Sequence, residues 1–222
     1  MAFAAQGKLE AFARACRRVA EAGLVRCGSG NMSWRVGEDL MAVSATRAWL
    51  ERLTADEVAV CRIGDGEVLN DRRPSVESRF HAGILRARPE VNVVLHFQSP
   101  NATALCCGEP EKTDFFVIIE VPYYIGRPAA VEYLPAGSPE LAAAIVEAAR
   151  NHDMILLKNH GQVVVGTNFD DAIQKAVLFE LACHVIVHGK NVQPLSEEAA
   201  ESLIAAGKTR DKENGGASLP AI

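Results

Sequence analysis

The first stretch of the chain has apolar side chains at helical spacing. Leu9, Phe12 and Cys16 recur at intervals of three and four residues within residues 7–22, which places them on one face of an α-helix. Gly23 follows this stretch and is a natural C-terminal stop. The pattern predicts a helix that covers a hydrophobic core.

Three further helices are predicted over residues 75–88, 139–151 and 168–188. A proline opens each of the first two, as is common at the first turn of a helix. Asn168 or Thr167 caps the third. This third helix is so apolar that we expect it to be buried, either inside the protein or between subunits.

Two other segments predict buried strands. Residues 91–100, VNVVLHFQSP, and residues 154–158, MILLK, are short apolar runs bounded by turn residues. Further strands are expected in a hairpin around the Gly-Asp-Gly at 64–66, at residues 115–119 and at residues 162–166. Residues 122–138, rich in Tyr, Pro and Gly, are the longest predicted loop.

The composition is typical of a globular protein. The 222 residues are 49% hydrophobic and 23% charged, enough for one large domain with a full core. We expect that domain over residues 1–208 and a flexible, polar tail over residues 209–222. No apolar run approaches the roughly 18 residues of a membrane-spanning helix, and early charges argue against a secretory signal.

The net charge and the cysteine content limit the expected classes of partner and the expected compartment. The net charge of -5 and the pI near 5.7 give no general attraction to nucleic acid or to an anionic membrane. We therefore expect small molecules and further copies of the chain as partners. Six cysteines without a C-x-x-C pair indicate a reducing cytoplasm, and the adjacent Cys106 and Cys107 are interpreted as small buried apolar residues.

Candidate metal ligands occur at the ends of the two buried strands. His96 and Gln98 project from the same side of a strand, about 7 Å apart, and His160 follows the strand at residues 154–158. Glu77 lies in the first turn of the helix at residues 75–88, one turn before His81. Taken singly, each histidine is more often a core residue, and Glu77 an ordinary carboxylate at a helix start. Together they are a donor set for one divalent ion of the zinc class.

Five ordered blocks carry a resemblance to a known family. GSGNMSWRV, SATRAWLERLT, PSVESRFH, VVLHFQSP and LLKNHGQVVVG, spread over residues 28–166, resemble the class II aldolase/adducin family. Their motifs are most similar to those of the fuculose-phosphate aldolases. The resemblance implies a three-layer α/β/α fold around a mixed, mostly antiparallel sheet. It also implies a homotetramer with zinc sites near subunit interfaces, and a sugar or sugar phosphate as substrate.

The resemblance assigns roles to individual residues. It makes His96 and His160 metal ligands, and Glu77 the catalytic acid/base that also touches the metal. The segment EYLPAGS makes Tyr133 a proton donor that reaches the site of a neighbouring subunit. The residues implied to line the phosphate or polar-head pocket are Gly30, Asn31, Ser44, Thr46 and Ser75.

Three departures from the family pattern bear on chemistry. The metal is expected to be Zn²⁺. Because Gln98 replaces a histidine of the family's H-x-H-S-P motif, Mn²⁺ or another divalent ion is the alternative. Arg47 replaces a glycine of the phosphate pocket and either binds a phosphate or carboxylate or fills the pocket. Val76 replaces a serine and removes one hydroxyl.

The function that the resemblance implies is a metal-dependent aldolase. Such an enzyme cleaves the carbon–carbon bond beside the carbonyl of a ketose or ketose phosphate and leaves a metal-stabilised enediolate. Three alternatives stay open: a pentulose-phosphate 4-epimerase, a sugar dehydratase on the same scaffold, and a non-catalytic adducin-like interaction domain. The epimerases usually have aspartate where this chain has Glu77, which favours the aldolase.

Overall fold

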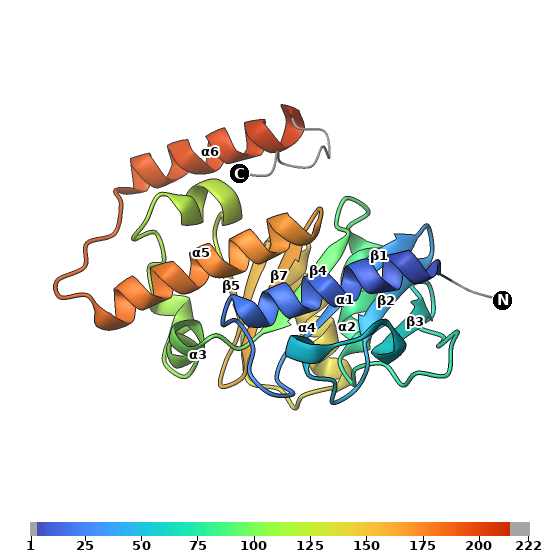
Figure 1. Ribbon diagram of the computed structural model, residues 1–222. Helices are drawn as coiled ribbons and strands as arrows, with labels where there is room; N and C mark the ends of the chain where they lie inside the picture. Colours follow the sequence, from blue (N-terminus) through green and yellow to red (C-terminus); the bar gives the residue numbers. More distant parts are fainter. Residues whose placement is uncertain (1–3, 214–222) are drawn as a thin grey trace.

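A mixed seven-stranded sheet forms the centre of the protein (Figure 1). The structure, a computed structural model, describes residues 4–213. The strand order is β3-β2-β1-β4-β7-β6-β5, and every neighbouring pair is antiparallel except β5 with β6. This confirms the expected mixed, mostly antiparallel sheet. The strands are β1 (Asn31–Gly37), β2 (Leu40–Ser44), β3 (Val58–Arg62), β4 (Val93–Phe97), β5 (Ala129–Val131), β6 (Met154–Leu157) and β7 (Gly161–Gly166).

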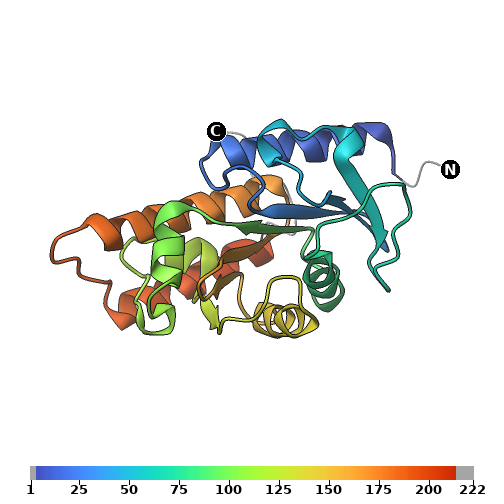
Figure 2. The same ribbon diagram turned by 90° about the horizontal axis from the view of Figure 1, so that it is seen from below.

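Helices cover both faces of the sheet, which makes three layers (Figure 2). One core joins Phe12 of α1 and Phe179 of α5 to Leu95 of β4, and the other joins Phe80 of α2 to Val94 of β4. Consecutive residues of β4 thus enter opposite cores, as the pleat of a strand requires. The helices are α1 (Gln6–Glu21), α2 (Ser78–Ala87), α3 (Pro100–Cys106), α4 (Pro139–Ala149), α5 (Phe169–His188) and α6 (Glu197–Glu213).

Several predicted elements are confirmed with small shifts at their ends. The long apolar helix is α5, which begins after Asn168, whose side chain accepts a hydrogen bond from the backbone N–H of Asp171. The two strands expected to carry chemistry are β4 and β6, and the returning strand is β7. Among residues 4–213, no helix combines the length and the apolar character needed to cross a bilayer.

The strand predicted at residues 115–119 is wrong. Phe115 and Phe116 are both buried, and the ring centroid of Phe115 lies 5.0 Å from that of Phe179 on α5, whereas Ile119 is 56% exposed. The segment packs as turns that lead into a π-helical turn, η4 (Val121–Ile125). A short apolar run has no periodicity that separates a strand from a buried turn.

Two smaller predictions are also corrected. Residues 209–213 belong to α6 and not to a tail, because α6 packs on η4: the guanidinium of Arg210 lies 4.6 Å from the ring centroid of Tyr124. A Cβ on Gly207 would lie against the backbone of Tyr123, so the contact is close. Residues 214–222 of the predicted tail lie outside the described residues.

Cys106 is buried as expected, but Cys107, the C-cap of α3, is exposed.

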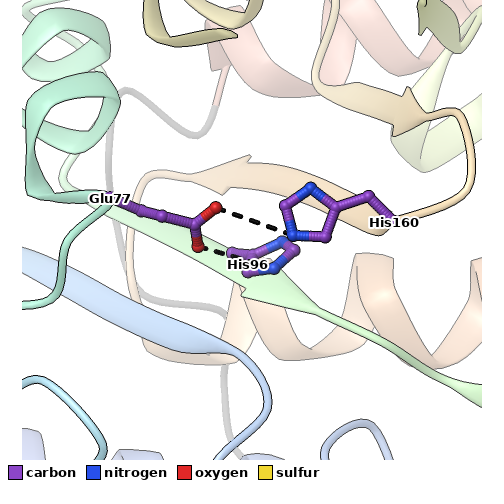
Figure 3. Close-up of side chains that lie close together, drawn as sticks. All are labelled: Glu77, His96 and His160. Atoms are coloured by element: carbon purple, nitrogen blue, oxygen red, sulfur yellow. Dashed lines mark ion pairs between the residues drawn. The ribbon is translucent and has the colours of Figure 1, made fainter. Parts of the chain in front are cut away.

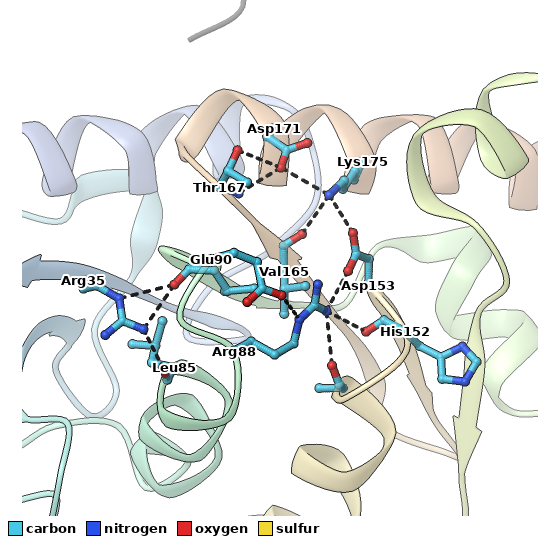
Figure 4. A network of polar contacts seen from close by, with 12 residues as sticks. Arg35, Leu85, Arg88, Glu90, His152, Asp153, Val165, Thr167, Asp171 and Lys175 are labelled. Atoms are coloured by element: carbon cyan, nitrogen blue, oxygen red, sulfur yellow. Dashed lines mark hydrogen bonds and ion pairs between the residues drawn. The ribbon is translucent and has the colours of Figure 1, made fainter. Parts of the chain in front are cut away.

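A polar network joins the connection after α2 to β6 and α5 (Figure 4). Lys175 on α5 donates to Asp153 over 2.8 Å, and Arg88 donates to the other carboxylate oxygen of Asp153 over 2.7 Å. Burial acts to raise the pKa of Asp153, but the two cations outweigh it and hold that pKa below its usual value. The network therefore keeps its charges paired at neutral pH.

Lys175→Met is expected to lower the free energy of unfolding by about 1–3 kcal/mol, because it removes the buried ammonium group that Asp153, Asp171 and the Val165 carbonyl share. Lys175 Nζ also lies within hydrogen-bond distance of Asp171 and of the Val165 carbonyl. Urea unfolding measures the change. Lys190→Met, at an exposed lysine, is the control and should stay within about 0.5 kcal/mol. Equal values for the two variants would show that the network adds no stability.

Candidate functional site

The structure brings Glu77, His96 and His160 together from three separate parts of the chain (Figure 3). Glu77 is the N-cap residue of α2, His96 lies near the end of β4, and His160 lies in the turn between β6 and β7. One ligand atom from each residue lies within 4.8 Å of the others. The two carboxylate oxygens of Glu77 are each 3.6 Å from a histidine, Oε2 from His96 Nε2 and Oε1 from His160 Nε2.

The environment of His96 fixes which nitrogen faces Glu77. His96 Nδ1 lies 2.9 Å from the backbone carbonyl oxygen of Gln162. A carbonyl only accepts, so Nδ1 carries the hydrogen and the lone pair is on Nε2. A metal-bound histidine typically donates its second ring N–H to such an acceptor. His96 is therefore held in the tautomer that a metal ligand needs.

The two carboxylate oxygens of Glu77 differ in their hydrogen bonding. Oε2 accepts a hydrogen bond of 2.8 Å from Asn31 Nδ2, whereas the buried Oε1 has no hydrogen-bond partner among the described residues. The residue is only 5% exposed, and a buried carboxylate oxygen without a partner is costly. A divalent cation between Glu77 and the two imidazoles would satisfy it, so the residues present fit a metal ion.

His160 is suited to the same role. Burial lowers the pKa of His160, the neighbouring His96 lowers it further, and Glu77 partly opposes them. The imidazole is thus favoured in the neutral form that binds metals. His160 and His96 have ring centroids 4.8 Å apart, so both rings border the same small volume.

Gln98 holds the turn that carries His160. Its Nε2 donates a 2.6 Å hydrogen bond to the backbone carbonyl of His160. Gly161 makes this approach feasible, because a Cβ there would lie 2.7 Å from both Gln98 Cγ and the Phe97 carbonyl oxygen. The side-chain nitrogen of Gln98 is therefore occupied, and coordination by its oxygen stays a prediction.

The predicted polar-head residues lie on three loops and on the adjoining ends of β1 (Asn31) and β2 (Ser44). The backbone N–H of Ser75 donates to the Ser44 carbonyl, and that of Thr46 donates to the Arg73 carbonyl. Gly30 has φ 76° and lies so close to β4 that a Cβ would be 2.8 Å from the His96 carbonyl oxygen. The loops are thus joined to one another and to β4, while their role in binding stays a prediction.

Arg47 and Tyr133 both point outward. Arg47 is exposed and has a left-handed φ of 63°, a conformation that glycine adopts without strain. Tyr133, in the connection between β5 and α4, is 63% exposed. The same connection reaches the start of α2, where Gly137 lies against Val76. The structure gives neither residue a contact with the Glu77, His96 and His160 group, and their roles stay predictions.

Two residues behind the site, His81 and Ser33, were not among the site residues predicted from the sequence, although His81 was noted one turn after Glu77. His81 Nε2 lies 2.5 Å from Asn31 Oδ1, and His81 Nδ1 lies 2.8 Å from Ser33 Oγ. Burial, with a smaller effect of His96, lowers the pKa of His81 to about 3. In the sequence, only residue spacing indicates these contacts. Glu77 and His81 are four residues apart, and Asn31 and Ser33 are two residues apart, so each pair lies on one face of its helix or strand.

The low pKa of His81 makes stability depend on pH. Its unfolded pKa is near 6.5, so between about pH 6.5 and pH 3 the unfolded chain binds a proton that the folded chain does not, and stability falls as the pH is lowered. His81 alone should lower the free energy of unfolding by about 1 kcal/mol from pH 6 to pH 5. Urea unfolding of the wild type and of His81→Gln measures this difference. Parallel pH profiles for the two proteins would contradict it.

Comparison with known proteins identifies relatives of the chain. Residues 10–187 match the family described as Class II Aldolase and Adducin N-terminal domain. The chain is 28% identical over 193 residues to a 3-oxo-tetronate 4-phosphate decarboxylase of Haemophilus influenzae, covering 85% of this chain and 91% of that protein. It is 31% identical over 175 residues to an L-fuculose phosphate aldolase of Methanococcus maripaludis, covering 78% and 93%.

Solved structures share the fold. YgbL of Escherichia coli superposes with a TM-score of 0.82 at 24% identity, covering 90% of this chain and 98% of that chain. An L-fuculose 1-phosphate aldolase superposes with a TM-score of 0.77 at 22% identity, covering 91% and 95%. These likenesses confirm the three-layer architecture expected from the sequence.

Proposed function

Because the chain belongs to the class II aldolase and adducin family, we propose that it is a metal-dependent carbon–carbon lyase that acts on a ketose or ketose phosphate. One observation carries the proposal: the buried Glu77 carboxylate faces two imidazoles, and its Oε1 has no hydrogen-bond partner among the described residues. An adducin-like interaction domain would have no need of this arrangement. Structural neighbours and relatives named as aldolases and decarboxylases support the same class of reaction.

Glu77, His96 and His160 would hold the divalent ion. When bound, it supplies Lewis-acid polarisation of the substrate carbonyl. Glu77 moves the proton at the nucleophilic carbon. Its Oε2 accepts from Asn31 Nδ2, so Oε1, which accepts no hydrogen bond from the described residues, is the oxygen that would bind the ion and, once released from it, take up the proton.

Tyr133 and the three loops at the site complete the proposed machinery. Tyr133, 63% exposed, acts as the proton donor at the aldehyde-side oxygen in the site of a neighbouring subunit, within a homotetramer. Its exposure in the single chain supports a role toward another subunit. The phosphate or polar head of the substrate binds at Gly30, Asn31, Ser44, Thr46, Arg47 and Ser75. All six cysteines are free, which supports a cytoplasmic location.

The metal is proposed to be Zn²⁺, with Mn²⁺ as the alternative, since Gln98 offers an amide where the family pattern has an imidazole. Gln98→His is expected to raise zinc affinity by about tenfold or more, because imidazole nitrogen is a better zinc ligand than amide oxygen. Competition with a chromophoric chelator measures the affinity. Gln98→Glu, which introduces oxygen ligands, is the matched control and should favour Mn²⁺ relative to Gln98→His. Equal zinc affinity in wild type and Gln98→His would place residue 98 away from the ion.

Decarboxylation of a 3-oxo acid phosphate is the second candidate. It breaks the bond between the carboxylate and the carbon next to the ketone, releases CO₂ and leaves an enediolate, so the same proton transfer by Glu77 serves it. Arg47 favours it, because an exposed guanidinium beside the polar-head loops suits a carboxylate or phosphate. The decarboxylase of Haemophilus influenzae, similar over 85% of this chain, supports this alternative.

A substrate panel tests the proposal. Metal-stripped and metal-reloaded protein are incubated with L-fuculose 1-phosphate, 5-deoxyribulose 1-phosphate and 3-oxo-tetronate 4-phosphate, while aldehyde and CO₂ are measured. We expect cleavage of at least one substrate by the reloaded protein only, and aldehyde or CO₂ distinguishes aldolase from decarboxylase. Glu77→Gln is the control for contaminating activity. Absence of metal-dependent cleavage across the panel would contradict the proposal.

A further inference from the structure

A row of buried polar side chains lies behind Glu77 and joins α2 to β1. Glu77 and His81 are one helical turn apart at the start of α2, and Asn31 and Ser33 are on the same face of β1. Asn31 Nδ2 lies 2.8 Å from Glu77 Oε2, and its Oδ1 lies 2.5 Å from His81 Nε2. Ser33 Oγ, 2.8 Å from His81 Nδ1, ends the row.

Chemistry fixes the direction of every hydrogen bond in this row. A Glu77 carboxylate that binds a metal ion only accepts, so the nitrogen of the Asn31 amide must face it and the amide oxygen must face His81. That oxygen also only accepts, so His81 Nε2 carries the hydrogen. A neutral imidazole has a single N–H, which leaves Nδ1 to accept from the Ser33 hydroxyl.

We propose that His81 and Ser33 are positioning residues that fix the Asn31 amide, which holds Glu77 Oε2 in place and leaves Oε1 free to bind the metal ion. This inference rests on the proposed function, since it takes Glu77 as the metal-binding acid/base. It extends that function to two residues that touch neither the carboxylate nor the other ligands through a hydrogen bond.

The surroundings of His81 support a fixed orientation. The His81 side chain is fully buried, and its ring stacks on Phe80 with centroids 4.4 Å apart and planes inclined by 20°. The low pKa of His81 keeps it neutral, which the alternating donors and acceptors require. If the Asn31 amide were free to turn by half a rotation, its oxygen would face Glu77 and repel the carboxylate. His81 Nε2–H prevents that turn, because it needs an acceptor.

A purely structural role for His81 makes a different prediction. If His81 only packs α2 on β1, its loss and the loss of the Asn31 amide act independently, and their effects on metal affinity multiply. If His81 acts through Asn31, its effect disappears once Asn31 is truncated. A double-mutant cycle separates these cases.

The cycle is measured as the metal dissociation constant of the full chain, stripped and titrated with Zn²⁺ against a chromophoric chelator. His81→Leu and Asn31→Ala are each expected to weaken binding by about 10–100-fold, the usual effect of losing an outer-shell partner. The double variant should bind no more weakly than Asn31→Ala alone. His81→Gln, whose amide nitrogen donates in place of Nε2–H, should stay within about threefold of the wild type.

Ile84→Ala is the matched control for packing, since Ile84 is fully buried on the same helix. It should lower the melting temperature and leave zinc affinity unchanged. If His81→Leu does not fold, Ser33→Ala replaces it in the same cycle, and its weakening of zinc binding should vanish in the Asn31→Ala background.

Wild-type affinity in His81→Leu, or multiplying effects in the double variant, would overturn the positioning role and leave the proposed function intact. A wild-type chain that binds no ion would overturn both. Failure of every substrate in the panel, with the cycle as expected, would count against the proposed reaction only.

Discussion

Glu77→Gln is expected to lower kcat by about 10²–10⁴-fold, the usual contribution of a general acid or base. The amide keeps the size of the side chain but cannot take up the proton at Oε1. It also replaces a charged acceptor beside Asn31 Nδ2 with a neutral one. Single-turnover kinetics with the best substrate of the panel measures the chemical step.

Two controls keep this result interpretable. Kinetics are measured at saturating metal, because Glu77→Gln also loses a carboxylate ligand and is expected to bind the ion more weakly, while its unfolding free energy should not fall. Glu140→Gln, in the first turn of α4, alters an exposed carboxylate and should leave kcat unchanged. Wild-type turnover by Glu77→Gln would exclude Glu77 as the acid/base.

His96→Ala is expected to abolish both metal retention and metal-dependent turnover. His96 is buried near the end of β4, and its Nε2 is held towards Glu77 by the hydrogen bond from Nδ1 to Gln162. The remaining donors, His160 and Glu77, would form a two-ligand site, which binds zinc weakly. Elemental analysis of protein purified without added metal, with kinetics in parallel, measures both losses.

His184→Ala provides the comparison, because His184 is an exposed histidine on α5. It should retain wild-type metal content and activity. A His96→Ala protein with a full complement of metal would place the ion elsewhere on the chain.

The sequence was most informative where local pattern decides structure. Alternation along residues 91–100 predicts that His96 points to one face of its strand, and in β4 it does, on the side of Phe80, whose ring centroid is 6.3 Å from that of His96. The capping residue Asn168 and the stop at Gly189 likewise bound α5 as expected. These features depend on residues close together in the chain.

Features that depend on distant residues needed the structure. Strand β4 pairs with β7, with His96 opposite Val163, and this pairing brings the end of β4 close to the turn that carries His160. The hydrogen bond from Asn31 to Glu77 spans 46 positions, so no local pattern indicates it. The five family-like blocks supplied this long-range information indirectly, because their order implies the fold.

At the residues that differ from the family pattern, the predicted roles stay predictions. Gln98 was expected as a metal ligand, and the structure shows its nitrogen bound to the His160 carbonyl. Arg47 was expected in the polar-head pocket, and its side chain is exposed at a left-handed backbone position. At such positions the family resemblance predicts where the residue lies, and the contacts of the side chain in this structure are needed to infer what it does.

X-ray absorption at the metal edge of the metal-loaded protein reports the ligands of the ion itself. We expect an inner shell with two imidazole nitrogens at about 2.0–2.1 Å and carboxylate or solvent oxygens beside them. The imidazole signal should weaken in His96→Ala and in His160→Ala. An ion without imidazole ligands would contradict the assignment of Glu77, His96 and His160 as the metal centre.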